Sequence, residues 1–417
     1  ILSLPKETRA HRDRTILVMS HCWRSCTVSK MVQLLSALRI HHLVAILAAY
    51  VLSFLAPVQA QRTYLFVGTY TEGRPDHGVF VYSFDEGTGA LELVAHGEDL
   101  TNPSFLTVSP DGGTLYACTE SKMAGLGSVT ALAFDSVKGE LRLLNKQPSG
   151  GENPVHITVD PSGRWVVNTN YTEASLSVFP VQADGSLGER AQQLRFKEGS
   201  LALQGRQDAA HLHAAVLGPD NKYLYVTDLG GDRIRVFHFD PEAALPLLAA
   251  DSLTIRTAPG SGPRHLAFHP NGHTAYCIEE LGGTIAVYNV DQGRLSLLER
   301  LPAYAKRPAV GNSADIHITA DGRFLYASNR GPGENSLSIH RVDPTTGRLT
   351  LVGHEPTSGD QPRNFTLDPS DRFLLVANLA SNEIVVFRRD PATGLLKKQG
   401  STKVLRPSCL SMRRYDQ

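Results

Sequence analysis

The chain has 417 residues, with 41 Lys and Arg against 41 Asp and Glu, 36 glycines, 24 prolines and five cysteines. An apolar fraction of 41% excludes a disordered or collagen-like chain, and five cysteines are too few for a disulfide scaffold. The net charge of zero leaves no basic excess of the kind that nucleic-acid-binding surfaces carry, so no nucleic-acid partner is expected.

Residues 1–60 have the features of an export leader. Arg39 precedes a 14-residue apolar run, Leu43–Ala56, and residues 58–60 place small side chains at positions −3 and −1 of a cleavage site. The run is shorter than the roughly 20 apolar residues that span a bilayer, which disfavours a membrane anchor. We expect a signal peptide at about residues 31–60, and a mature chain that is periplasmic or secreted without stable membrane insertion.

After the leader, one phrase recurs about every fifty residues: a proline, a short strand, a Pro-Asp-Gly type of turn and a second strand. Alternation with period two around a hairpin turn predicts two antiparallel strands for each copy. The largest interval, 58 residues between Pro161 and Pro219, marks an insertion near 182–208 that we expect to form an extended loop. The six copies occupy residues 102–120, 153–171, 211–229, 262–281, 313–330 and 361–379.

Each copy is followed by a third strand, as in 284–291, and then by a fourth, as in 139–146. Four strands in about fifty residues are typical of a propeller blade. At the ends, 63–70 matches a second strand without a first, and 406–412 matches a first strand without a second. We therefore predict a single all-β domain over 61–417, a seven-bladed β-propeller with four-stranded blades, closed by the C-terminal strand joining the N-terminal blade.

A comparison of the blades separates structural residues from candidate functional ones. Residues shared by all blades are expected to be structural, whereas polar residues that vary at the strand starts and strand ends point to one mouth of the channel. Convergent polar groups in a concave site are the default candidate for an active site. The positions are Ser104-Phe105, Val155-His156, His213-Ala214, Arg264-His265, Ala314-Asp315 and Arg363-Asn364 at the starts, and Glu120, Asn170, Asp228, Glu280, Arg330 and Asn378 at the ends.

Motifs for other chemistries are absent from the sequence after residue 60. There is no GxSxG, HExxH or paired CxxC, so neither a hydrolase serine elbow nor a zinc site is expected. His211 and His213 fall on one strand face, but no further ligands are identifiable, so we predict no metal and no cofactor. The predicted site consists of His213, Glu280 and Arg264 as catalytic residues and Arg330, His156 and Asp315 as substrate-binding residues.

Long runs of the sequence resemble the lactonase family of seven-bladed propellers, whose type is bacterial 6-phosphogluconolactonase; fungal 3-carboxy-cis,cis-muconate cycloisomerase is similar. The resemblance covers 62–412 and implies an active site of one His, two Arg and one Glu at the channel mouth. By local motif these fall on His213, Arg264, Glu280 and Arg330. The matching runs are YLFVGTYTEG (64–73), HLHAAVLGPDNKYLYVTDLGGDRIRVF (211–237), GPRHLAFHPNGHTAYCIEELGGTIAVY (262–288), NSADIHITADGRFLYASNRG (312–331) and QPRNFTLDP (361–369).

The expected function is metal-independent hydrolysis of a small-molecule sugar lactone by a monomer or weak oligomer. His213 or Glu280 would be the general base, and Arg264 and Arg330 would bind an anionic group or the developing oxyanion. A carboxylate between two arginines has a low pKa, which favours His213 as the base. Two alternatives stay open: a muconate-type cycloisomerase that uses the same mouth, and an exported propeller that binds a partner without catalysis.

Overall fold

The computed structural model describes residues 61–416 apart from 73–76, 98, 307 and 332, together with residues 31 and 33. The chain divides into two units, Ile1–Ala60 and Gln61–Gln417. The predicted signal peptide therefore lies almost wholly outside the described residues. In the part of the chain that is described, no helix is long and apolar enough to cross a membrane.

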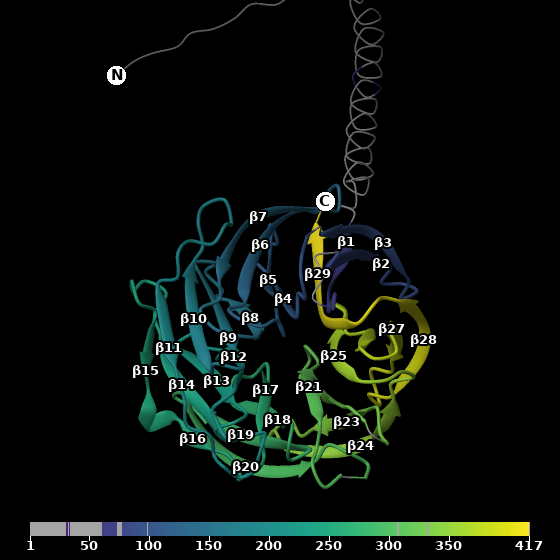
Figure 1. Ribbon diagram of the computed structural model, residues 1–417. Helices are drawn as coiled ribbons and strands as arrows, with labels where there is room; N and C mark the ends of the chain where they lie inside the picture. The colour runs from purple at the N-terminus through teal and green to yellow at the C-terminus, as the bar shows by residue number, and fades with distance from the viewer. Residues whose placement is uncertain are drawn as a thin grey trace, which may run out of the picture. The chain divides into compact units, whose positions relative to one another are not determined.

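The described strands of the second unit form seven antiparallel sheets around a channel (Figure 1), which confirms the predicted seven-bladed propeller. Six sheets have four strands, and the blade of β12 gains a fifth, β16 (Ile255–Arg256), which follows the short 3-10 helix η1 (Asp251–Leu253). The closing blade contains β1 (Gln61–Thr69), β2 (Val79–Phe84), β3 (Leu91–Gly97) and β29 (Pro407–Asp416). The next three blades contain β4–β7 (Phe105–Val108, Thr114–Thr119, Ser128–Asp135, Glu140–Pro148), β8–β11 (Pro154–Val159, Trp165–Asn170, Ser175–Pro180, Gln192–Arg195) and β12–β15 (Leu212–Leu217, Tyr223–Asp228, Arg233–Phe239, Leu247–Ala249). The last three contain β17–β20 (Pro263–Phe268, Thr274–Glu279, Thr284–Asp291, Arg294–Pro302), β21–β24 (Ser313–Ile318, Phe324–Asn329, Ser336–Val342, Leu349–Pro356) and β25–β28 (Pro362–Leu367, Phe373–Asn378, Glu383–Arg389, Leu396–Lys403).

The core lies between neighbouring blades. Alternation along the strands places apolar side chains on both faces of a blade, and each face packs against the next sheet. One such cluster joins Phe324 of β22 to Phe365 of β25 and Leu374 of β26, all fully buried. Burial of each side chain of this size contributes about 1.5–3 kcal/mol. This packing holds the innermost strands in fixed positions around the channel.

The insertion near 182–208 is only partly the loop that was expected. Gln192–Arg195 forms β11, the outer strand of its blade, and residues 196–211 then cross toward the next blade. The crossing segment is anchored by Gln207, which is buried and donates hydrogen bonds to Leu229 O and Asp232 Oδ1, both at 2.8 Å. This anchor holds Arg206 over the channel, where it joins the site described below.

Removal of residues 407–417 is expected to abolish cooperative unfolding of the propeller. Strand β29 pairs with β1 along its whole length and buries Cys409 and Tyr415, so its loss exposes an apolar sheet edge. Thermal unfolding followed by circular dichroism would check this result, with a chain lacking only residue 417 as the control. A sharp transition within a few degrees of the intact chain would show that closure by β29 is dispensable.

Candidate active site

Bulges at the starts of the innermost strands aim side chains into the channel. The pairing register shifts at Val155 in β8, between Leu212 and Ala215 in β12, and at Arg264 in β17. It also shifts between Ser313 and Ile316 in β21 and at Arg363 in β25. A bulge places two residues opposite one and redirects a side chain, which is why bulges occur beside functional sites. Here two consecutive residues of the same strand therefore serve two different levels of the channel.

Two cavities occupy these levels. The mouth cavity, about 130 Å³, is lined by Lys122, Asn153, Val155, Tyr171, His213, Glu280, Arg330 and Arg363. The inner cavity, about 420 Å³, is lined by the second residues of the bulged starts and by residues farther along the same strands; its polar lining includes His156, His265, Asp315, His317 and Asn364. Of the six predicted site residues, His213, Glu280 and Arg330 line the mouth cavity.

Glu280 is the only carboxylate among the described residues that line the mouth cavity, and it is fully engaged. Its Oε1 lies 2.7 Å from Arg206 Nη2, and its Oε2 lies 3.0 Å from Arg330 Nη2 and 3.1 Å from Arg264 Nε. Burial alone would raise the pKa of Glu280, but Arg330, Arg264 and Arg206 bring the pKa down to about 2. Glu280 is therefore an ionised counter-charge and a poor proton acceptor near neutral pH.

His213 has the opposite character. The side chain is 4% exposed, and its Nδ1 has no hydrogen-bond partner among the described residues. Burial lowers the pKa of His213 well below its usual value, and the positive charge of Arg264 lowers this pKa further. The imidazole is therefore neutral at pH 7 and offers an uncommitted ring nitrogen. This geometry favours His213 over Glu280 as a general base.

Arg264 lies behind Glu280 rather than on the wall of the mouth cavity. The side chain is only 2% exposed, and its Nη1 donates to Ala314 O and, over 3.2 Å, to His265 Nε2. Its catalytic assignment remains a prediction. The contacts that the structure does give place it as a support for Glu280.

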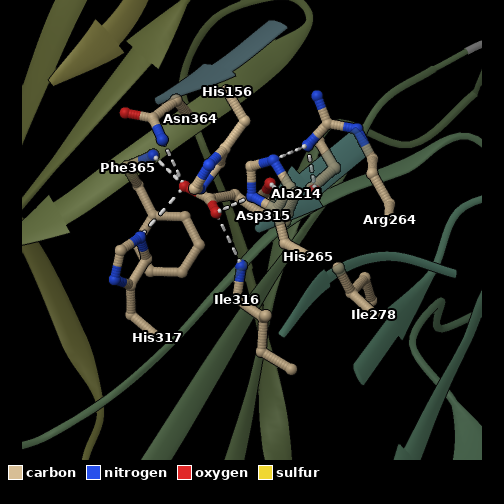
Figure 2. Close-up of polar contacts among 12 residues, drawn as sticks. His156, Ala214, Arg264, His265, Ile278, Asp315, Ile316, His317, Asn364 and Phe365 are labelled. Carbon is tan, nitrogen blue, oxygen red and sulfur yellow. Dashed lines mark hydrogen bonds and ion pairs between the residues drawn. The ribbon is translucent and has the colours of Figure 1, made fainter. Parts of the chain in front are cut away.

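His156 and Asp315 do not reach the mouth cavity. Both are buried and line the inner cavity. The ring centroid of His156 lies 5.7 Å from that of His265 (Figure 2) and 4.3 Å from that of Phe105. They were expected at the mouth because each directly follows a strand's first channel-facing residue, but the bulge sends the second residue inward. Their predicted role in substrate binding is untested.

The expected alignment of the strand ends was wrong by one residue in three blades. Asn170 and Asp228 are fully buried and form hydrogen bonds with nearby backbone atoms. Asn170 Nδ2 donates to Ser149 O at 3.1 Å, and Asp228 Oδ1 accepts from Gly231 N at 2.8 Å. Asn378 is buried in the same way. In the blade of β9 the residue that lines the mouth cavity is the next one along the chain. Tyr171, which lines the mouth cavity, was missed for this reason.

Lys122 and Arg363 add a cationic side to the mouth cavity. In the described part of the chain neither forms an ion pair with a carboxylate, and both lie over the ring of Tyr70, at 4.2 Å for Lys122 Nζ and 5.5 Å for Arg363 Cζ. Burial, and then the charges of Arg363 and Arg406, lower the pKa of Lys122 to about 8. Cations on a cavity wall that have no carboxylate partner are well placed to bind an anion.

No cluster of metal-ligating side chains is found in the ranges that the structure describes. The residues above make a seven-bladed β-propeller with a cation-rich cavity at one mouth of its channel. The family model "Lactonase, 7-bladed beta-propeller" matches residues 64–412, and the chain belongs to this family.

Named relatives agree with the family. A 6-phosphogluconolactonase of Formosa agariphila is 44% identical over 80% of this chain and 94% of its own length. A 6-phosphogluconolactonase of Bacillus subtilis is 33% identical over 83% of this chain and 97% of its own length. The solved structure of the periplasmic gluconolactonase of Pseudomonas aeruginosa is 36% identical, with a TM-score of 0.79, over 85% of this chain and 99% of that chain.

Proposed function

We propose that the chain hydrolyses a sugar lactone at the mouth cavity, with His213 as general base. The observation that carries the proposal is a neutral imidazole on the wall of a cavity whose other ionised groups are mostly cationic. The relatives named as lactonases support the activity.

In the proposed reaction, His213 takes a proton from a water molecule as the water oxygen attacks the lactone carbonyl carbon. The negative charge that develops on the carbonyl oxygen is stabilised by the guanidinium group of Arg330, which lines the cavity. The tetrahedral intermediate then collapses, the bond between the carbonyl carbon and the ring oxygen breaks, and the protonated His213 returns its proton to the ring oxygen. The product is the open-chain hydroxy acid.

The test is the rate of hydrolysis of phosphorylated and unphosphorylated gluconolactone by the purified protein, with and without EDTA. Spontaneous hydrolysis must be subtracted because lactones open in water without an enzyme. Turnover that survives EDTA is the expected result. Absence of turnover on both lactones would reject the proposal, and turnover on a muconate instead would assign the mouth to the cycloisomerase reaction.

The pH profile should reflect a neutral His213. Because burial and Arg264 lower its pKa, the imidazole stays unprotonated as the pH falls from about 8 to about 6. After subtraction of the spontaneous rate, kcat/KM for the unphosphorylated lactone is expected to stay level over this range and to fall only at lower pH. A half-maximal loss near pH 6.5 would show instead a histidine with an ordinary pKa at the site.

We further propose that the substrate carries an anionic group apart from the reacting carbonyl, and that Lys122 and Arg363 bind this group. Lys122→Met is expected to raise KM for the phosphorylated lactone by about 10- to 100-fold, the equivalent of one lost charge-assisted hydrogen bond. KM for the unphosphorylated lactone should change much less. The matched control is Lys138→Met, since Lys138 is exposed and does not line the mouth cavity. Equal effects on the two substrates would rule out this subsite.

Export is also proposed for this chain. The leader pattern of residues 31–60 supports it, and a structural relative is periplasmic. Expression in a bacterium, followed by cell fractionation and N-terminal sequencing, tests it. The expected product is outside the cytoplasm and begins near residue 61. A cytoplasmic product that keeps residues 31–60 would contradict it.

A further inference from the structure

A continuous string of polar contacts connects the two cavities of the channel. Glu280 Oε2 lies 3.1 Å from Arg264 Nε, Arg264 Nη1 lies 3.2 Å from His265 Nε2, and His265 Nδ1 lies 2.7 Å from Asp315 Oδ1. Figure 2 shows the inner part of this string, with Arg264, His265 and Asp315 pointing toward one another. The string therefore joins the carboxylate of the mouth cavity to the carboxylate of the inner cavity.

The contacts determine which nitrogen of His265 carries the proton. A guanidinium only donates hydrogen bonds, so His265 Nε2 must accept from Arg264. A neutral ring then has its proton on Nδ1, where it is donated to Asp315 Oδ1. Burial and then the charge of Arg264 together lower the pKa of His265 to about 4. The ring is therefore neutral at pH 7. Asp315 thus selects the one tautomer that presents a lone pair to Arg264.

Asp315 is itself held from several sides. Its Oδ1 also accepts from Ile316 N at 3.0 Å, and its Oδ2 accepts from Phe365 N at 3.1 Å, His317 Nε2 at 3.0 Å and the Asn364 amide. These donors come from β21 and β25, and His265 comes from β17. The carboxylate is therefore rigid and ionised, and its negative charge faces a histidine on each side.

A buried ionic string of this kind gives little stability, since apolar side chains of similar volume often pack as well. Its value lies in fixing orientation. We propose that Asp315 and His265 are positioning residues, which hold Arg264 against Glu280 and so fix the groups around the substrate in the mouth cavity. The proposal has a kinetic test, which rests on the lactonase function proposed above, and a structural test, which depends only on the tautomer of His265.

The kinetic test compares three variants. His265→Phe keeps the ring shape and removes both nitrogens, and kcat is expected to fall about 10- to 100-fold, the usual cost of small misplacements at a site, with KM changed less than about 3-fold. His265→Gln restores one donor and one acceptor and is expected to recover part of kcat. Thr366→Val, at the wall of the inner cavity and outside the string, is the control and should match the wild-type enzyme.

The structural test measures the imidazole nitrogens of His265 by 15N NMR in the wild-type protein and does not depend on activity. A protonated Nδ1 and an unprotonated Nε2 at pH 7 are expected, and the opposite tautomer would overturn the proposal. Wild-type kcat in His265→Phe would also overturn it, while leaving the lactonase function intact. If the wild-type protein opened no lactone, the lactonase function would fall and the tautomer would decide the positioning role alone.

Discussion

Replacement of His213 by glutamine is expected to lower kcat/KM for lactone hydrolysis by about 100- to 10,000-fold, the usual contribution of a general base. Glutamine fills much of the same space but cannot accept a proton at neutral pH. The buried imidazole has an unbonded Nδ1 and no ion pair to lose, so the fold should tolerate the change. The initial rate of lactone opening, corrected for the spontaneous reaction, measures the effect.

Two further measurements make the result for His213 specific. The midpoint of thermal unfolding should stay within a few degrees of the wild-type value, which separates loss of chemistry from loss of structure. His238→Gln is the matched control, because His238 is exposed on β14. If His213→Gln retained more than about a tenth of the activity, the general base would have to be another group, because loss of a general base lowers the rate by more than about 10-fold.

Replacement of Glu280 by glutamine is expected to destabilise the propeller by about 3–5 kcal/mol, the cost of leaving buried charges unpaired. Three arginines share this one carboxylate, and Arg264 is buried with it. For a domain of this size, such a loss lowers the midpoint of thermal unfolding by roughly 5–10 °C. Differential scanning calorimetry measures it, and activity should fall with it because the arginines lose their common anchor.

The control for Glu280 is an ion pair on the surface. Glu299 lies 3.0 Å from Arg348, both partly exposed, and Glu299→Gln should cost less than about 1 kcal/mol. Added phosphate should recover part of the stability of Glu280→Gln, because an anion in the mouth cavity restores the missing charge. Equal unfolding midpoints for Glu280→Gln and the wild-type protein would mean that the arginines need no counter-charge.

The repeat made the fold predictable, because hairpin turns and period-two alternation repeat in every blade. The third strand expected at 284–291 is β19 to the residue, and the C-terminal strand closes the ring as predicted, although it runs on to Asp416. The same repeat hid part of the site. A bulge changes which residues face the channel without changing the alternating pattern, so Asp315 was expected at the mouth. Tyr171 was missed because the strand ends were aligned one residue too early in its blade.

The sequence also could not predict which residues outside the repeat belong to the site. Lys122 follows β5 in a turn where its backbone φ is 57°, a left-handed conformation that lysine rarely adopts. Arg206 belongs to the insertion, for which no other blade offers a comparison. The choice between His213 and Glu280 as the base was easier to predict. A carboxylate among arginines is ionised whatever its exact contacts, which leaves His213 as the better proton acceptor.

The pairing of β1 with β29 also affects how the propeller forms. Gln61 Nε2 bonds to Asp416 Oδ1 across 355 positions of sequence, so the first blade cannot be completed until the last strand has been synthesised. Contacts between such distant segments slow folding, because a long loop must close before they form. The inner cavity depends on the same event, since Leu410, Ser411 and Met412 form part of its wall. A nascent or truncated chain therefore holds most of the mouth residues but lacks the completed channel that orients them.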